Sequence, residues 1–170
     1  MSYDLMVFDP AVAPRDRAAF KAWYEKVVDW PDDESAFDPA TSSSALQEWY
    51  RSMLPKWPDM QDTANDDSDN PHITGYSFAA HAIYVDFRWS VAEEAYDDVR
   101  SAAVSHQVGF YDVSGDEGDG EIYFPGDELR PSSGGGWRQV SADFRSGNLD
   151  KYIFAAKPKR SWFDFFRRKK

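Results

Sequence analysis

The chain contains no cysteine among its 170 residues. This absence excludes disulfide bridges, thiol catalysis and cysteine-ligated metal centres. No apolar run approaches the roughly 20 residues that are needed to cross a bilayer. The first ten residues, MSYDLMVFDP, include an acid and lack the basic start of a secretory signal. We therefore expect a soluble, cytoplasmic protein.

Lysine and arginine are scarce over most of the chain and concentrated at its end. The sequence has 19 basic and 30 acidic residues, which gives a formal net charge of −11. Residues 157–170 carry seven bases and one acid, a net charge of +6, so residues 1–156 carry −11 − 6 = −17. Such an acidic body repels nucleic acids and anionic membranes and attracts basic proteins. We expect one acidic domain over residues 1–156, followed by a basic aromatic tail over 157–170.

Residues 81–114 organise the expected fold, because they read as strand, helix and strand with almost no connecting residues. In the segment HAIYVDFRW, polar and apolar residues alternate with the period of two that is typical of a half-buried strand. Ser90 and Glu93 then have the spacing of a capping box, which predicts the start of a helix. Gly109 is placed to adopt a left-handed conformation and end that helix.

The remaining segments predict a sheet of short strands with helices between them. We expect a strand at 3–8, helices at 14–30 and 41–54, a strand at 73–80 paired with 82–89, and a hairpin of 110–114 with 121–124. Residues 137–144 and 151–156 are compatible with a helix or a strand pair. The order β-α-α-β-β-α-β-β predicts an α+β fold with helices packed on one face of a mainly antiparallel sheet.

No residue pattern in the chain predicts catalysis, a cofactor or a metal. The three histidines, His72, His81 and His106, have none of the spacings of histidine metal sites. The acidic loops 59–70 and 115–128 lack the ligand spacing of a calcium-binding EF-hand. The glycine-rich part of the second loop has acids rather than bases around it, which argues against phosphate binding.

Two alternative functions remain compatible with the sequence. A small enzyme or metal-binding protein would use Asp112 or Glu121 together with His106, in a pocket that perturbs their pKa values. A membrane-peripheral adaptor would use the basic tail, whose aromatic residues share one helical face (Trp162, Phe165 and Phe166). The same tail is also suited to folding back on the acidic body or to entering a partner's groove.

Four segments of the chain carry a resemblance to a known family. They are SYDLMVFDP at 2–10, the F-x-x-W-Y pattern at 20–24, FRWSVAEEAY at 87–96 and VGFYDVSG at 108–115. The type and order of these motifs, which span most of residues 2–124, resemble those of a family of small bacterial proteins. That family is associated with polymorphic-toxin and contact-dependent growth inhibition loci, where its members are suspected immunity proteins. Trp57-Pro58-Asp59-Met60 resembles its phenylalanine-proline-x-methionine element.

The resemblance implies a protein that blocks a cognate toxin by tight, stoichiometric binding and needs no chemistry of its own. Many such toxins are basic nucleases, for which an acidic inhibitor can take the place of the nucleic-acid backbone. We therefore expect a toxin domain as the partner and no direct binding of nucleic acid by the acidic body. The predicted interface consists of acidic loop residues and two neighbouring aromatic residues: Asp62, Asp66, Asp67, Asp69, Asp116, Glu117, Asp119, Trp57 and Tyr123.

Overall fold

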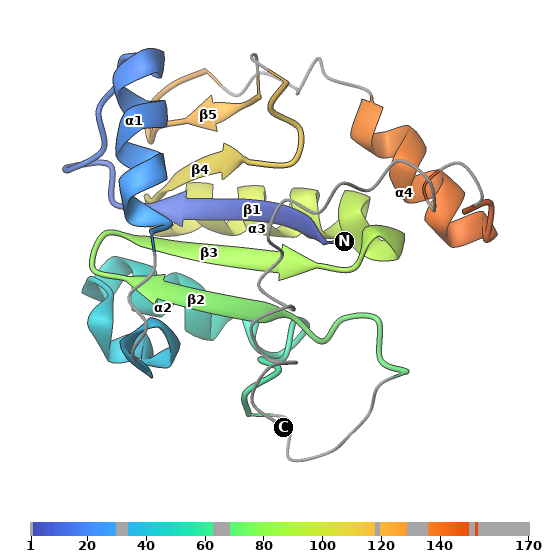
Figure 1. The fold of residues 1–170 in the computed structure, drawn as a ribbon. Helices are drawn as coiled ribbons and strands as arrows, with labels where there is room; N and C mark the ends of the chain where they lie inside the picture. Colours follow the sequence, from blue (N-terminus) through green and yellow to red (C-terminus); the bar gives the residue numbers. More distant parts are fainter. Residues whose placement is uncertain are drawn as a thin grey trace.

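The computed structural model of the chain describes residues 2–29, 34–62, 69–117, 120–128, 136–149 and 152. In this part of the chain, strands form one antiparallel sheet with the order β2-β3-β1-β4-β5 (Figure 1). The strands are β1 (Tyr3–Phe8), β2 (Gly75–Ala79), β3 (Ala82–Phe87), β4 (Gly109–Asp112) and β5 (Ile122–Tyr123). An antiparallel sheet combined with helices confirms the predicted α+β class.

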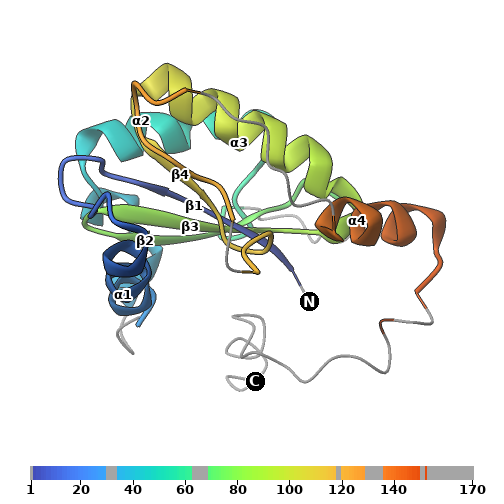
Figure 2. The ribbon, with the colours of Figure 1, turned by 90° about the horizontal axis from the view of Figure 1, so that it is seen from above.

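Helices lie on both faces of the sheet. They are α1 (Arg17–Val27), α2 (Ser44–Met53), α3 (Ala92–His106) and α4 (Gly136–Ser146). Helices α2 and α3 cover one face, and α1 lies on the other (Figure 2). The expectation that the helices pack on one face is therefore wrong for α1. The physical reason is that β1 is apolar on both sides: Leu5 and Val7 join the core under α2 and α3, and Met6 and Phe8 join the core under α1.

Aromatic side chains fill much of the core between the sheet and α2. Tyr50 of α2 makes edge-on contacts with Tyr76 and Phe78 of β2, at ring-centroid distances of 4.9 and 5.0 Å. Trp57, which follows α2, packs edge-on against Phe87 of β3 at 4.9 Å. Rings packed in this geometry contribute more than their buried area alone. Much of the chain's high aromatic content is thus used in the core.

The ends of α3 differ from the prediction. Residues Trp89–Val91 form a short 3-10 helix, η3, and Val91 precedes α3 without a side-chain cap, so the Ser90–Glu93 capping box does not form. Gln107 ends the helix in the left-handed conformation, with a φ of 56°. Gly109 lies inside β4 instead, where a Cβ atom would come within 2.2 Å of the Phe8 ring. This glycine is needed for the close approach of Phe8 to the strand.

The outer edges of the sheet are short or covered. Strand β5 has two residues. Beside β2, Thr74 exchanges backbone hydrogen bonds with Pro58 and Met60, and the Ser42 hydroxyl donates to the carbonyl of Ala79. The neighbouring segments therefore occupy hydrogen-bonding groups at both ends of this edge.

The C-terminal part of the chain resolves one open question and leaves others outside the described residues. Residues 137–144, for which the sequence favoured neither state, belong to helix α4. The observed order is thus the predicted one followed by a helix. Of 151–156 only Tyr152 is described, and the predicted tail 157–170 lies outside the described residues. In the part of the chain with described structure, no helix is both long and apolar enough to cross a membrane.

Candidate partner-binding site

One end of the sheet gathers four aspartates, and we call this group the acidic end: Asp4, Asp59, Asp86 and Asp112. Asp4 of β1 and Asp86 of β3 are direct cross-strand neighbours. Asp112 is the last residue of β4, which is antiparallel to β1. Asp59 forms an isolated bridge with Thr74, the residue before β2. All four positions therefore lie where β1 begins, near the N-terminus in Figure 1.

Burial and mutual repulsion perturb these carboxyl groups. Asp86 is 5% exposed and Asp112 is fully buried. Burial, reinforced by the charges of Asp4 and Asp59, raises the pKa of Asp86 to about 7. Burial, reinforced by Glu121, raises the pKa of Asp112 to about 6. Burial is the largest cause of both raised pKa values, and a nearby cation would stabilise the charged form of either group.

The carboxylate of Asp86 lies in space that a glycine leaves free. Its partner on β2 is Gly75, where a Cβ atom would come within 2.2 Å of the Asp86 carboxylate. Asp4 flanks Asp86 on the other side. Within the described part of the chain, no hydrogen bond or ion pair to the Asp86 side chain is found. Like charges directly opposite each other destabilise a sheet, so this arrangement reduces the stability of the fold.

Two tyrosines and a serine connect the acidic end to the rest of the fold. The hydroxyl of Tyr84 donates to Asp4, and it also forms a hydrogen bond with Tyr24 of α1. The backbone N–H of Asp4 donates to the hydroxyl of Ser114 at 2.8 Å, and the N–H of Ser114 donates to the carbonyl of Asp4 at 3.0 Å. These contacts fix the start of β1 between α1 and the β4–β5 turn.

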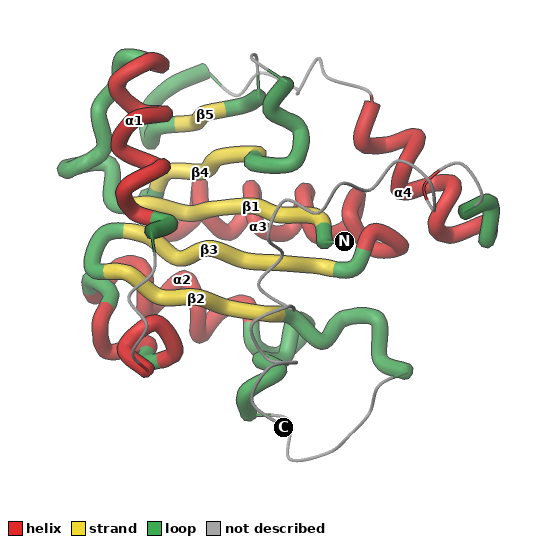
Figure 3. The backbone as a smooth tube through the Cα atoms, in the orientation of Figure 1, coloured by secondary structure: helices red, strands yellow, loops and turns green. Residues whose placement is uncertain are grey.

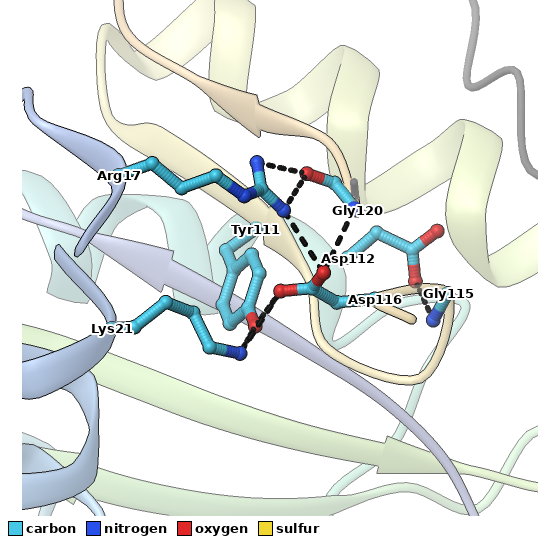
Figure 4. Close-up of polar contacts among 7 residues, drawn as sticks. All are labelled: Arg17, Lys21, Tyr111, Asp112, Gly115, Asp116 and Gly120. Atoms are coloured by element: carbon cyan, nitrogen blue, oxygen red, sulfur yellow. Dashed lines mark hydrogen bonds and ion pairs between the residues drawn. The ribbon is translucent and has the colours of Figure 1, made fainter. Parts of the chain in front are cut away.

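Asp116 holds that turn against α1 (Figure 4). One of its oxygens accepts from Arg17 and from the N–H of Gly120, both at 2.9 Å. The other accepts from Lys21 at 2.9 Å and from the Tyr111 hydroxyl at 2.6 Å. The carboxylate is 2% exposed, and two bases neutralise its charge. Asp116 was predicted as an interface residue, and its contacts are those of a residue that joins a helix to a turn.

The other predicted interface residues fall into three groups. Asp62, Asp69 and Glu117 have exposed side chains. Trp57 and Tyr123 are buried in the core, and the indole N–H of Trp57 donates to Asp98 at 2.9 Å. Three predicted residues lie outside the described residues: Asp66, Asp67 and Asp119.

Asp4 and Asp86 were not predicted as site residues, although each occupies a polar position in an alternating strand. In the strand at 82–89, the alternation assigned Asp86 to the solvent side. The feature that singles out this pair is the register between β1 and β3, which places two carboxylates opposite each other. That register joins segments about eighty residues apart, and no local pattern encodes it.

The alternative catalytic group is only partly assembled. Glu121 accepts from Arg100 at 2.8 Å and from the Tyr96 hydroxyl. Its negative charge contributes to the raised pKa of Asp112. Asp112 accepts from the Tyr3 hydroxyl at 3.2 Å and from the N–H of Gly115 at 2.8 Å. His106 ends α3, just before the start of β4, whereas Asp112 ends that strand. The structure therefore brings Asp112 and Glu121 together but not His106.

Neither metal geometry nor comparison with known proteins assigns a function to these residues. Among the described residues, no group of three histidine, cysteine, aspartate or glutamate side chains is arranged to hold a metal ion. Comparisons with family models, with curated proteins and with solved structures find no match to the chain.

Proposed function

We propose that this chain is an immunity-type protein that neutralises a cognate basic toxin, with a nuclease as the favoured class, by stoichiometric binding at its acidic end. One observation carries the proposal: Asp4 and Asp86 lie opposite each other, and Asp86 is buried without a described partner. A cationic side chain placed there by a partner would relieve their repulsion. Residues that are held in a destabilising arrangement are typical of functional sites.

Exposed acidic residues on both sides of the Asp4–Asp86 pair support the proposal that this end of the sheet is the binding surface. Asp62 and Asp69 belong to the loop that precedes β2 in the chain. Glu117 belongs to the turn that comes after β4 (Figure 3). Strands β2 and β4 are three places apart in the sheet. With about 4.8 Å between neighbouring strands, the two loops flank the pair at a separation of roughly 14 Å. A single protein domain can contact all of them at once.

Electrostatic complementarity would provide both fast association with a basic partner and selectivity for it. Residues 1–156 carry a formal charge of −17, which accelerates encounter with a basic partner and disfavours acidic ones. A nuclease that binds phosphates through lysine and arginine side chains presents the matching surface. This mode of inhibition requires binding alone.

A growth-rescue experiment tests the proposal. The chain is co-produced in a bacterial host with any candidate toxin domain that a neighbouring gene encodes, and we expect growth to be restored and a one-to-one complex to be isolated. The double variant Asp4→Asn/Asp86→Asn, which keeps side-chain size and removes both charges, should lose most of the protection. Its matched control is Glu25→Gln/Asp29→Asn, which removes two exposed acids within and just after α1 and should protect fully. A neighbouring gene without a toxin domain, or equal protection by both variants, would contradict the proposal.

A further inference from the structure

We infer that helix α4 is a detachable cap: it leaves and rejoins the fold as a unit, while the sheet and the other helices stay in place. Its departure uncovers an aromatic surface next to the acidic end. The opening of α4 is independent of the proposed function, whereas the use of the uncovered surface by a partner rests on that function.

Three buried polar groups where α4 packs against η3 have no hydrogen-bond partner among the described residues. They are the indole N–H groups of Trp89 and Trp137 and the hydroxyl of Ser141. Trp89 is the first residue of η3, and Trp137 and Ser141 lie about one turn apart on α4. These three residues are 8%, 5% and 0% exposed. Buried polar groups are nearly always paired, so opening, which gives all three to water, recovers hydrogen bonds that the closed state lacks.

The closed state is held mainly by aromatic contacts of two α4 side chains. The Trp137 ring lies 4.9 Å from the ring of Tyr3 and 5.2 Å from that of Tyr96, measured between centroids. Phe144 stacks on Trp89 at 6.2 Å. An ion pair between Arg145 and Glu93 of α3 joins two side chains that are more than a third exposed, and such pairs add little to stability.

Helix α4 is also placed so that it can leave without disturbing the sheet. Figures 1 and 2 both show it beyond the end of the sheet where β1 begins. Its first residue, Gly136, and the residue after its end, Gly147, have no atom within 4 Å of the position of a Cβ atom. Both ends of the helix are therefore free of close packing. Such peripheral elements open with less free energy than the core.

Opening exposes the rings of Tyr3, Trp89 and Tyr96, which α4 contacts in the closed state. Tyr3 precedes Asp4 in β1, and Trp89 follows the strand that carries Asp86. The uncovered rings thus lie next to the acidic end. Aromatic residues beside acids form the kind of surface on which a basic partner finds both apolar anchors and charge.

Arg138 of α4 shows which side chain fits this surface. Its guanidinium lies 4.4 Å from the ring centroid of Trp137 and 5.4 Å from that of Tyr96. Its positive charge acts to lower the pKa of Asp112, which favours the ionised form of that group. When α4 leaves, this cation leaves with it, and an arginine of a basic partner can take its place.

A cap of this kind makes binding depend on the open population. A partner that contacts the uncovered rings binds only the open state and shifts the molecules toward it. Its apparent affinity is then reduced by the fraction of molecules that are open.

Hydrogen exchange at the indole N–H groups of the unchanged chain tests the opening. We expect the signals of Trp89 and Trp137 to exchange together. The matched control is Trp49, whose indole N–H is also buried without a described partner but lies in the core under α2. It should exchange roughly tenfold more slowly or less, because it waits for a larger unfolding event. Backbone amides of α4 should exchange with Trp89 and Trp137, since an undocked helix of 11 residues is not stable alone.

Thiol labelling provides a second measurement, because the chain contains no cysteine. Ser141→Cys introduces one thiol under α4 and breaks no hydrogen bond to a described residue. Ser77→Cys, in β2 and 1% exposed, is the matched control within the sheet. Under native conditions, and relative to the rates in denaturant, we expect an aromatic disulfide to label the Ser141→Cys thiol roughly tenfold faster or more.

Three outcomes would overturn the inference. They are equal exchange of the Trp49, Trp89 and Trp137 indoles, exchange of Trp89 while Trp137 stays protected, and equal relative labelling of the two thiols. The first and third would show that α4 opens only when the whole fold unfolds, and the second that it does not leave as a unit. These measurements contain no toxin, so their failure leaves the proposed function to the growth-rescue test.

Discussion

Gly109 lies under the ring of Phe8, so this position of β4 has no room for a side chain. We expect Gly109→Ala to lower the free energy of unfolding by about 1–3 kcal/mol, because the ring or the strand must shift. Gly136→Ala is the matched control, since no atom lies within 4 Å of the added Cβ there. Urea denaturation of both variants provides the measurement. Equal midpoints for the two variants would show that the Phe8 contact is not restrictive.

Asp112 makes stability depend on pH. The group is fully buried and burial raises its pKa to about 6, whereas an unfolded aspartate releases its proton near pH 4. Between these values the folded protein holds a proton that the unfolded chain has lost, so stability falls as the pH rises from about 4 to about 6. Asp112→Asn removes this titration and can still accept from Tyr3 and Gly115. We expect the variant to exceed the parent by about 2 kcal/mol at pH 8 and to match it near pH 4.

Denaturation of the parent and of Asp112→Asn at several pH values measures this difference. Asp69→Asn is the control for the loss of one negative charge, because Asp69 is exposed, and its stability profile should follow that of the parent. If Asp112→Asn also follows the parent at every pH, the carboxyl group is not the source of the dependence.

Helix α1 is attached to the β4–β5 turn through the carboxylate of Asp116 and through the carbonyl of Gly120, which accepts from Arg17 at 2.9 Å. Asp116→Ala would leave Arg17, Lys21 and the N–H of Gly120 without this acceptor. We expect a loss of about 2–3 kcal/mol in unfolding free energy. Asp127→Ala breaks an ion pair with Arg15 in which both side chains are largely exposed, and it should cost less than about 1 kcal/mol. Thermal unfolding compares the two, and similar losses would argue against a structural role for Asp116.

At the level of elements, the hydrophobic periodicity of the sequence and its turn-forming residues were sufficient to predict most strands and helices and their order. The unbroken apolar run from Leu5 to Phe8 contained the information that β1 is covered on both faces, but the prediction of a one-sided sheet did not use it. The capping box at Ser90 failed because the chain forms the 3-10 turn η3 first. Close packing around Phe8, rather than helix termination, explains Gly109.

The candidate site could be predicted only in part, because its central pair, Asp4 and Asp86, lies far apart in the sequence. Charge composition indicated an acidic surface and identified the exposed residues Asp62, Asp69 and Glu117. Asp4 and Asp86 become neighbours only through strand register. Trp57 and Tyr123 show the opposite difficulty, because aromatic residues are frequent both in interfaces and in cores, and only their burial distinguishes the two.

The location of negative charge on the molecule, and not its net value alone, predicts how fast a basic partner associates. If the proposed function holds, reversing the exposed acids Asp62, Asp69 and Glu117 to lysine should slow association with the partner toxin domain about tenfold at low salt and weaken its salt dependence. The matched control reverses Glu25, Asp29 and Glu48, which are exposed acids outside the acidic end, and changes net charge equally. Stopped-flow or surface-based kinetics measure both rates. Equal slowing would mean that net charge, rather than its location, governs encounter.

The two margins of the sheet limit the ways in which another protein can bind. Strand β5 is too short to template an added strand, and segments 58–60 and 42–43 engage the ends of the β2 margin. A partner cannot readily extend this sheet, so recognition has to rely on side chains rather than on backbone pairing. The same closure disfavours fibre-like stacking of identical copies. Identical copies of the chain therefore have little free backbone through which to pair, which favours their remaining dispersed at high concentration.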